Sequence, residues 1–207
     1  MSNGGGSAGG SAGAEARRVA IEAVRRIDEE EAFANLLLPS LLGASDLDRR
    51  DRNLVTEMVY GSTRMRRAVD WLVDRYLESP PPPALRASLR VGAYQLAFMR
   101  VPAHAAVDAT VSASAKRNRG AVNAILRRVS KSLPVETWPT EAIRLSVPDW
   151  LLHRLTVDLG AEAATAALTA MNEAPGVTER PDGYVQDRAS QAVVELVGAG
   201  GGDTVLD

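Results

Sequence analysis

The stretch that decides the fold runs from Leu89 to Val129 and reads LRVGAYQLAFMRVPAHAAVDATVSASAKRNRGAVNAILRRV. Its apolar residues recur every three or four positions, which predicts successive amphipathic helices and not strands. The first of these helices is the best candidate for the centre of a bundle. Val101-Pro102 ends it, because proline cannot donate the helical hydrogen bond. Gly92 lies inside it, so we expect another backbone to pack closely there.

The segments before this stretch show the same helical spacing. We expect an amphipathic helix over 15–29, and a second that is capped by Asp46 or Asp48 and ends near Gly61. A third ends before a run of four prolines, which form a stiff connection because none of them can continue a helix. No stretch before Leu133 alternates like a strand, so the first domain is predicted to be all-α.

A basic cluster occupies the last third of the opening stretch. Between Asp108 and Glu136 there are six cations and no acid, although the net charge of the whole chain is −2. Such a concentration of charge predicts contact with RNA phosphates through counterion release, and the alternative interpretation is a solvated helix face. The candidate RNA-binding residues are Lys116, Arg117, Arg119, Arg127, Arg128 and Lys131.

Other arginines are interpreted differently. Those in the predicted helix over 15–29 alternate with acids, which indicates a solvated, ion-paired face in preference to a second RNA surface. Arg90 and Arg127 are interpreted as buried ion-pair or bundle-edge residues, with Asp51 and Asp70 as possible partners. The sequence leaves these pairings open.

The remaining polar and aromatic residues give weak functional signals. His104 and His153 are far apart and lack a carboxylate at ligand spacing, which favours structural roles, and we expect no metal site. Asn123 is expected to satisfy backbone groups near a helix start or to contact a neighbouring helix, with RNA contact as the alternative. Tyr94 and Trp71 are predicted core residues. No aromatic residue lies inside the basic cluster, so base stacking is not predicted there.

The composition is that of a globular protein with one main core. Hydrophobic residues make up 45% of the chain and charged residues 24%. No apolar run approaches the roughly 18 residues of a membrane span, so we expect a soluble, cytoplasmic protein without a membrane partner. Residues 1–14, rich in Gly, Ser and Ala, are expected to form a disordered tail, or alternatively an engineered linker.

Three motifs in order resemble one known family. They are DRRDRNLVTEMVYGSTR at 48–64, LRVGAYQLAFMRVPAHAAV at 89–107 and VNAILRRV at 122–129. They resemble the NusB-type helical domain, which occurs alone in a bacterial transcription antitermination factor and as the N-terminal domain of the RsmB (Sun/Fmu) 16S rRNA cytosine-C5 methyltransferases. The resemblance implies a NusB-like helical RNA-binding domain over 15–133. It also implies RNA as the partner, with 16S rRNA first, and ribosomal or transcription proteins as further partners.

Later motifs separate the two kinds of relative. They are SVPDWLLHRL at 146–155, AMNEAP at 170–175 and GYVQDRASQAVVELV at 183–197 with TVLD after it. These resemble the linker helices of the methyltransferase and the entry to its catalytic domain. The resemblance implies linker helices over 134–175 and a truncated start of an α/β methyltransferase domain over 176–207, with a buried strand at Val205-Leu206. A small subdomain that the family carries near Thr178 is expected to be missing. The alternative is an antitermination-type module that acts through a protein partner and a transcript.

The same resemblance bears on catalysis. Cytosine C5 methylation needs a thiolate to attack C6, and the family's loop for S-adenosylmethionine follows the strand with which this sequence ends. The sequence contains no cysteine, which also excludes disulfides and thiolate metal sites within it, and Gly198 to Gly202 precede the predicted strand. We therefore expect no catalytic residue, no bound cofactor and no methyl transfer from these residues.

Overall fold

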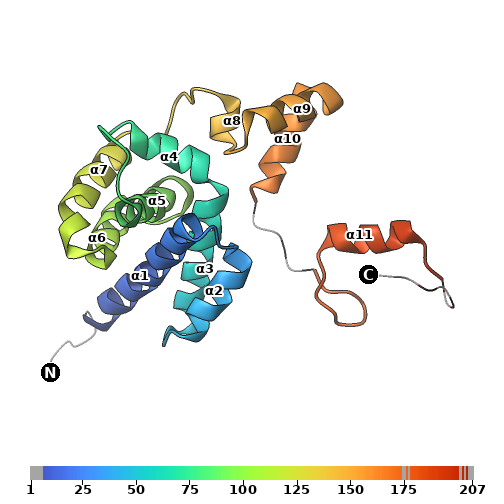
Figure 1. The fold of residues 1–207 in the computed structure, drawn as a ribbon, viewed down its shortest axis with the longest axis horizontal. Coiled ribbons are helices and arrows are strands. Elements are labelled where there is room, and N and C mark those ends of the chain that lie inside the picture. The colour runs from blue at the N-terminus through green and yellow to red at the C-terminus, as the bar shows by residue number, and fades with distance from the viewer. Residues whose placement is uncertain (1–6, 174–175, 177, 201, 203, 205–207) are drawn as a thin grey trace. The chain divides into compact units, whose positions relative to one another are not determined.

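The computed structural model describes residues 7–173, 176, 178–200, 202 and 204, with the side chains of 7–12 left aside (Figure 1). The chain divides into two compact units, one up to Leu168 and one from Thr169, and each is described by itself. The described residues form helices, and their β pairing is limited to one isolated bridge between Glu179 and Val185. The predicted all-α fold class is therefore confirmed.

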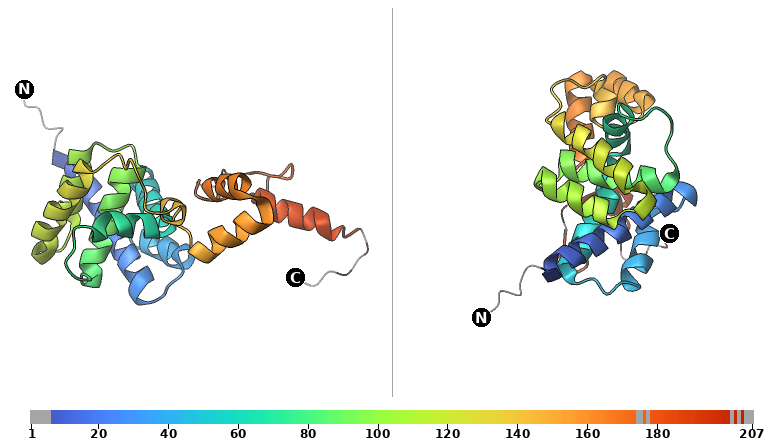
Figure 2. Two further views of the ribbon diagram at one scale, coloured as in Figure 1. Left: turned by 90° about the horizontal axis from the view of Figure 1, so that it is seen from above. Right: turned by 90° about the vertical axis from the view of Figure 1, so that its left-hand side faces the viewer.

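The first unit is built on a bundle in which α5 is central, as predicted. Helix α5 contacts α1, α3, α4, α6 and α7, and it is seen end-on among them in Figure 1. Helix α2 lies at the edge, against α1 and α3 (Figure 2). The helices of the bundle are α1 (Ser7–Glu29), α2 (Ala34–Gly43), α3 (Arg49–Arg64), α4 (Arg66–Asp74), α5 (Pro83–Phe98), α6 (Ala103–Ala113) and α7 (Arg119–Lys131), with the 3-10 helix η1 (Lys116–Asn118) before α7.

Two apolar clusters fill the bundle, and α5 contributes to both. Ala87 and Val91 join the cluster that α1, α2 and α3 build, whereas Leu89 and Ala93 join the cluster of α4, α6 and α7. Every residue from 87 to 95 is buried, including the polar ones. A helix that is apolar on more than one side must lie inside a bundle, which is why this stretch fixes the arrangement of the others.

Two glycines permit close packing between helices. A Cβ on Gly92 would lie 2.3 Å from Leu126 Cδ1, so the group that packs closely here is a side chain of α7 and not the predicted backbone. A Cβ on Gly61 would lie 2.0 Å from Tyr94 Cζ. The prediction that the helix ends near Gly61 is wrong, because α3 continues to Arg64 and uses the missing side chain to admit the buried Tyr94 ring.

The helix starts agree only in part with the sequence pattern. Asp48 caps α3 by accepting a hydrogen bond from the Asp51 N–H at 2.8 Å, so the second of the two predicted caps is used. Helix α1 begins at Ser7 and not at Glu15. The Arg17 guanidinium donates to the Gly13 carbonyl at 2.8 Å, which ties this glycine-rich turn to the buried part of the helix.

Three short helices follow the bundle: α8 (Glu141–Arg144), α9 (Asp149–Leu159) and α10 (Ala161–Met171), the last of which continues past Leu168 into the second unit. Arg67 of α4 binds the segment between α8 and α9. Its N–H donates to Ser146 Oγ at 2.9 Å, and its guanidinium donates to the Val147 carbonyl at 2.5 Å and to Asp149 at 2.7 Å. These helices occupy the range predicted for the linker.

The second unit contains α11 (Arg188–Val197), capped by Asp187, which accepts from the Ala189 N–H at 2.8 Å. None of its residues is buried. The predicted strand at Val205-Leu206 lies outside the described residues. Throughout the described part of the chain, no helix is both long and apolar enough to span a membrane.

Candidate nucleic-acid interface

Helix α7 has one apolar face and one cationic face. Its buried residues, Val122, Ile125, Leu126 and Val129, pack into the cluster of α4, α5 and α6. Because successive residues turn by about 100° around a helix, burial of this stripe forces the other positions toward solvent. The exposed positions opposite the stripe are Gly120, Ala124, Arg127 and Lys131.

All six predicted RNA-binding cations are exposed, but they do not meet at one point. Lys116, Arg117 and Arg119 lie on η1 and at the start of α7, whereas the other three lie in its last turns. The 13 residues of α7 span roughly 20 Å, so the two groups stand at the two ends of one rod. The basic edge, as we name these six residues together, is an extended surface, and at its N-terminal end Lys116 and Arg119 line a pocket of ≈ 430 Å³ together with Arg18, Glu22 and Arg25 of α1.

The C-terminal group of the basic edge contacts uncharged partners only. Arg127 Nε donates to Asn123 Oδ1 at 2.8 Å, and the Arg128 guanidinium lies 5.3 Å from the centre of the Tyr76 ring. Lys131 has no partner among the described residues. Asn123 therefore orients an arginine one turn further along its own helix, so the predicted roles at a helix start or toward a neighbouring helix are wrong. No carboxylate cancels the charge of this group.

The N-terminal group is anchored by one of its own members. Arg119 donates to the carbonyls of Ser112 and Ser114 at 3.0 Å and 3.2 Å, and so satisfies acceptors at the end of α6. Its charge is attracted to that carbonyl end but is not neutralised by an acid. The side chains of Lys116 and Arg117 make no hydrogen bond or ion pair within the described chain, so their charged ends are available to an anion.

The arginines of α1 differ from those of the basic edge, and the predicted solvated, ion-paired face is confirmed for Arg18, Arg25 and Arg26 but is wrong for Arg17. Arg17 is buried and donates to Gln95 Oε1 at 2.8 Å, and burial lowers its pKa. The others lie beside acids at helical spacing, and the hydrogen bond with Glu22 raises the pKa of Arg25. The pairs are Arg18 with Glu15, Arg25 with Glu22 and with Glu29, and Arg26 with Glu30.

Arg90 is a structural arginine inside the bundle. It donates to both carboxylate oxygens of Asp70 at 2.7 Å and also binds Asp28, so it joins α5 to α4 and α1. Burial acts most strongly on it and lowers its pKa, but the hydrogen bonds and charges of the aspartates together leave the pKa above its ordinary value. The predicted partner Asp70 is confirmed, whereas the charge of Asp51 acts on Arg17.

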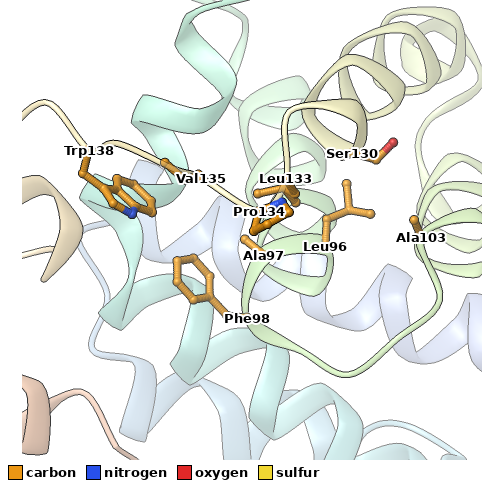
Figure 3. Close-up of a pocket in the computed structure, with 9 residues that line it drawn as sticks. All are labelled: Leu96, Ala97, Phe98, Ala103, Ser130, Leu133, Pro134, Val135 and Trp138. Carbon is orange, nitrogen blue, oxygen red and sulfur yellow. The ribbon is translucent and has the colours of Figure 1, made fainter.

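A pocket of ≈ 420 Å³ lies beside the C-terminal end of α7 (Figure 3). In Figure 3, Phe98 and Trp138 lie toward one end, Leu96, Ser130 and Ala103 toward the other, and Leu133 and Pro134 between them. The sequence pattern missed this pocket because its two aromatic residues lie outside the basic cluster, one before and one after it. Only the fold brings both of them to the segment that ends α7.

The two histidines stand alone. His104 is exposed at the start of α6, and His153 is exposed on α9. Within the ranges that the structure describes, no three His, Cys, Asp or Glu side chains are grouped so that they could hold a metal ion.

A helical bundle with a buried central helix and a cationic edge defines a class of protein, the small helical binding domains. Residues 14–131 match the NusB family, which is more than half of the chain. The chain belongs to the NusB family. The bundle of α1 to α7 is the part that carries this family's sequence.

The relatives show which branch of the family is similar. A protein of Mycobacterium tuberculosis whose name assigns it provisionally to the methyltransferases is 32% identical over 207 residues, which is 88% of this chain and 45% of that protein. Ribosomal RNA small subunit methyltransferase B of Xanthomonas campestris is 36% identical over 155 residues, covering 72% of this chain and 34% of its own. The enzyme of the same name from Pseudomonas putida is 32% identical and covers 67% and 34%. The predicted resemblance to this methyltransferase family is confirmed, and the chain spans less than half the length of these relatives.

Proposed function

We propose that this chain is the RNA-binding N-terminal part of a 16S rRNA cytosine-C5 methyltransferase, and that it contacts RNA through the basic edge. The observation that carries the proposal is the exposure of six cations along η1 and α7, none of which is paired with an acid among the described residues. The relatives named as small subunit rRNA methyltransferases support 16S rRNA as the target.

The geometry of α7 suits contact with a phosphate backbone. Arg127 and Lys131 are one turn apart on the same face, so their Cβ atoms are about 5–6 Å apart. Gly120 and Ala124 occupy the same exposed face and carry almost no side chain, so a strand can approach the helix between the two cationic ends. Binding of this kind neutralises phosphates and releases counterions, so it is sensitive to salt and largely independent of base sequence.

In this proposal the chain itself transfers no methyl group. The reaction requires a thiolate nucleophile, and the sequence has no cysteine. The glycines at the end of α11 also do not fit a cofactor loop, because Gly198 has φ 62° and ends the helix as its C-cap. Incubation with S-adenosylmethionine and 16S rRNA should give no 5-methylcytosine, and its formation would refute this part of the proposal.

A NusB-type module that binds a transcript together with a ribosomal or transcription protein is the second candidate. The family match over 14–131 favours it, because that match covers the bundle alone. The alignment of the methyltransferase relatives over up to 88% of the chain favours the first candidate. Capture of 16S rRNA from total cellular RNA supports the first, and capture of a transcript only in the presence of a protein partner supports the second.

RNA binding is tested most simply by fluorescence anisotropy with a fragment of 16S rRNA. The double variant Lys116→Gln/Arg117→Gln removes two exposed cations that hold nothing else in place. Its affinity should fall, and the slope of log K against log salt should become shallower by about 1.4 for single-stranded RNA, or 0.7 for each lost contact. An unchanged affinity would contradict the assignment of these residues.

A further inference from the structure

We propose that the pocket in Figure 3 receives one unstacked base of single-stranded RNA while the strand continues along the C-terminal half of the basic edge. This inference rests on the proposed RNA binding, and it names the pocket as the place in the fold that binds a base of single-stranded RNA. The pocket is lined by Leu96, Ala97, Phe98, Ala103, Ser130, Leu133, Pro134, Val135 and Trp138.

The walls of the pocket match the flat, apolar faces of a base. Its volume of ≈ 420 Å³ falls in the range of small-ligand sites, about 300–1,000 Å³. Phe98 is 37% exposed, so one large aromatic ring is open to solvent at this pocket. Proteins that recognise single strands place splayed bases against such rings.

Both aromatic rings are held by a second ring. Phe98 stacks on Tyr94, with 5.7 Å between ring centres, and Tyr94 is buried. Trp138 lies against Trp71 with 4.9 Å between ring centres. A ring fixed in this way loses little freedom on binding, so the pocket is preorganised for stacking.

The charge around the pocket selects an anionic strand over an apolar peptide. Ser130 lines the pocket, Lys131 follows it in the chain, and Arg127 precedes it by about one turn of α7. Arg100 is exposed two residues after Phe98 and makes no ion pair within the described chain. Glu136, also exposed, is the one acid of the segment from 130 to 138. Cations flanking a stacking surface are the arrangement that binds phosphates on either side of a base.

A duplex does not fit this arrangement. Its bases are stacked on one another, and reaching a pocket with aromatic walls requires that a base leave the stack. The pocket therefore predicts a preference for single-stranded RNA or loops over paired RNA of the same length. With this pocket, the basic edge, which contacts only phosphates, would bind single-stranded regions of an RNA more tightly than paired regions.

The test compares two polyanions and one substitution. A labelled single-stranded RNA of about ten nucleotides supplies bases and phosphates, whereas inorganic polyphosphate supplies charge alone. Phe98→Leu removes the ring and retains apolar bulk. It should lower the affinity for RNA about five-fold or more relative to the affinity for polyphosphate. The matched control is Phe33→Leu at the N-cap of α2. This ring is 72% exposed and does not line the pocket, so the ratio of the two affinities should not change.

A second variant guards against a loss of folding. Ser130→Leu fills the pocket from the α7 side without removing an aromatic ring, and it should lower the same ratio. If both variants keep the unfolding temperature of the parent chain and the ratio of RNA to polyphosphate affinity does not change, the base pocket is refuted while phosphate binding stands. If the parent chain binds neither polyanion, the proposed function itself fails.

Discussion

Helices α1 and α7 are both amphipathic and both rich in arginine, yet the exposed arginines of the two helices have different partners. On α1, glutamates stand three or four residues from Arg18, Arg25 and Arg26, and each arginine is ion-paired. On α7, the nearest partners are an amide, an aromatic ring and backbone carbonyls. The number of arginines therefore does not identify an RNA surface. The proposed RNA surface of α7 differs from α1 in having no acids at helical spacing.

The pairs on α1 contribute little to stability, because exposed ion pairs are typically worth about 0–1 kcal/mol. Their main physical effect is that the carboxylates balance the positive charge of the arginines, so the net charge on this face of α1 stays close to zero. Two amphipathic helices of the same bundle can thus have opposite roles toward a polyanion, and the difference lies in a few exposed side chains.

The largest effect is expected from a third kind of arginine, the buried Arg90. Arg90→Leu removes the partner that Asp70 and Asp28 share and leaves them only Arg86 and Arg66, each at 3.4 Å, although these carboxylates are only 24% and 18% exposed. We expect a loss of about 3 kcal/mol in the free energy of unfolding, measured by urea denaturation. A loss below about 1 kcal/mol would mean that the network is no more important than the surface pairs of α1.

Reversal of charge on α7 should give the next largest effect. Arg127→Glu/Lys131→Glu places two acids on the exposed face and should reduce RNA affinity about ten-fold or more at low salt, with the unfolding midpoint nearly unchanged. Anisotropy titration measures the first quantity and thermal unfolding the second. An affinity equal to that of the parent chain would remove α7 from the interface.

A single acid added to α7 should pair with its arginines, as the acids of α1 pair with theirs. Ala124→Glu adds a carboxylate three and four residues before Arg127 and Arg128, at an exposed position, and removes no cation. RNA affinity should fall about five-fold because the new ion pairs compete with phosphate. The isosteric control Ala124→Gln should change it little. Equal effects of Glu and Gln would show that bulk, and not charge, is responsible.

The converse change on α1 should give the smallest effect. Glu22→Gln/Glu30→Gln removes one ion pair of Arg25 and the ion pair of Arg26, and it leaves every arginine in place. We expect a gain in RNA affinity of about two-fold, since only the general electrostatic attraction to RNA rises. A gain as large as the loss from Ala124→Glu would mean that any unpaired arginine helix of this bundle binds RNA equally well.

The sequence predicted the features that depend on local spacing. Helical periodicity located α5, Asp48 was among the predicted caps, and the acids among the arginines of α1 predicted ion pairs because i, i+3 and i, i+4 neighbours meet on one helix face. Even Arg90 was assigned to an ion pair, with Asp70 among its possible partners.

Features that depend on contacts between distant segments were missed. The sequence predicts a helix end near Gly61 because no neighbouring residue shows that the Tyr94 ring fills the space a side chain at Gly61 would need. The pocket was missed for the same reason, since Phe98 and Trp138 reach it from either side of α7 in the chain. The sequence predicts each residue of the basic edge. It does not predict that these residues form two separate groups, because that depends on the length of α7, which the sequence pattern alone does not delimit.

The salt dependence of RNA binding tests the central claim most directly. The variants to compare are Arg127→Gln/Lys131→Gln on α7 and Arg18→Gln/Arg26→Gln on α1, which change the net charge equally. The α7 variant should make the slope of log K against log salt shallower by about 1.4 for single-stranded RNA, and the α1 variant should leave the slope as it is. Equal slopes for the two variants would contradict the account, because they would show that α7 contributes nothing beyond its share of the total charge.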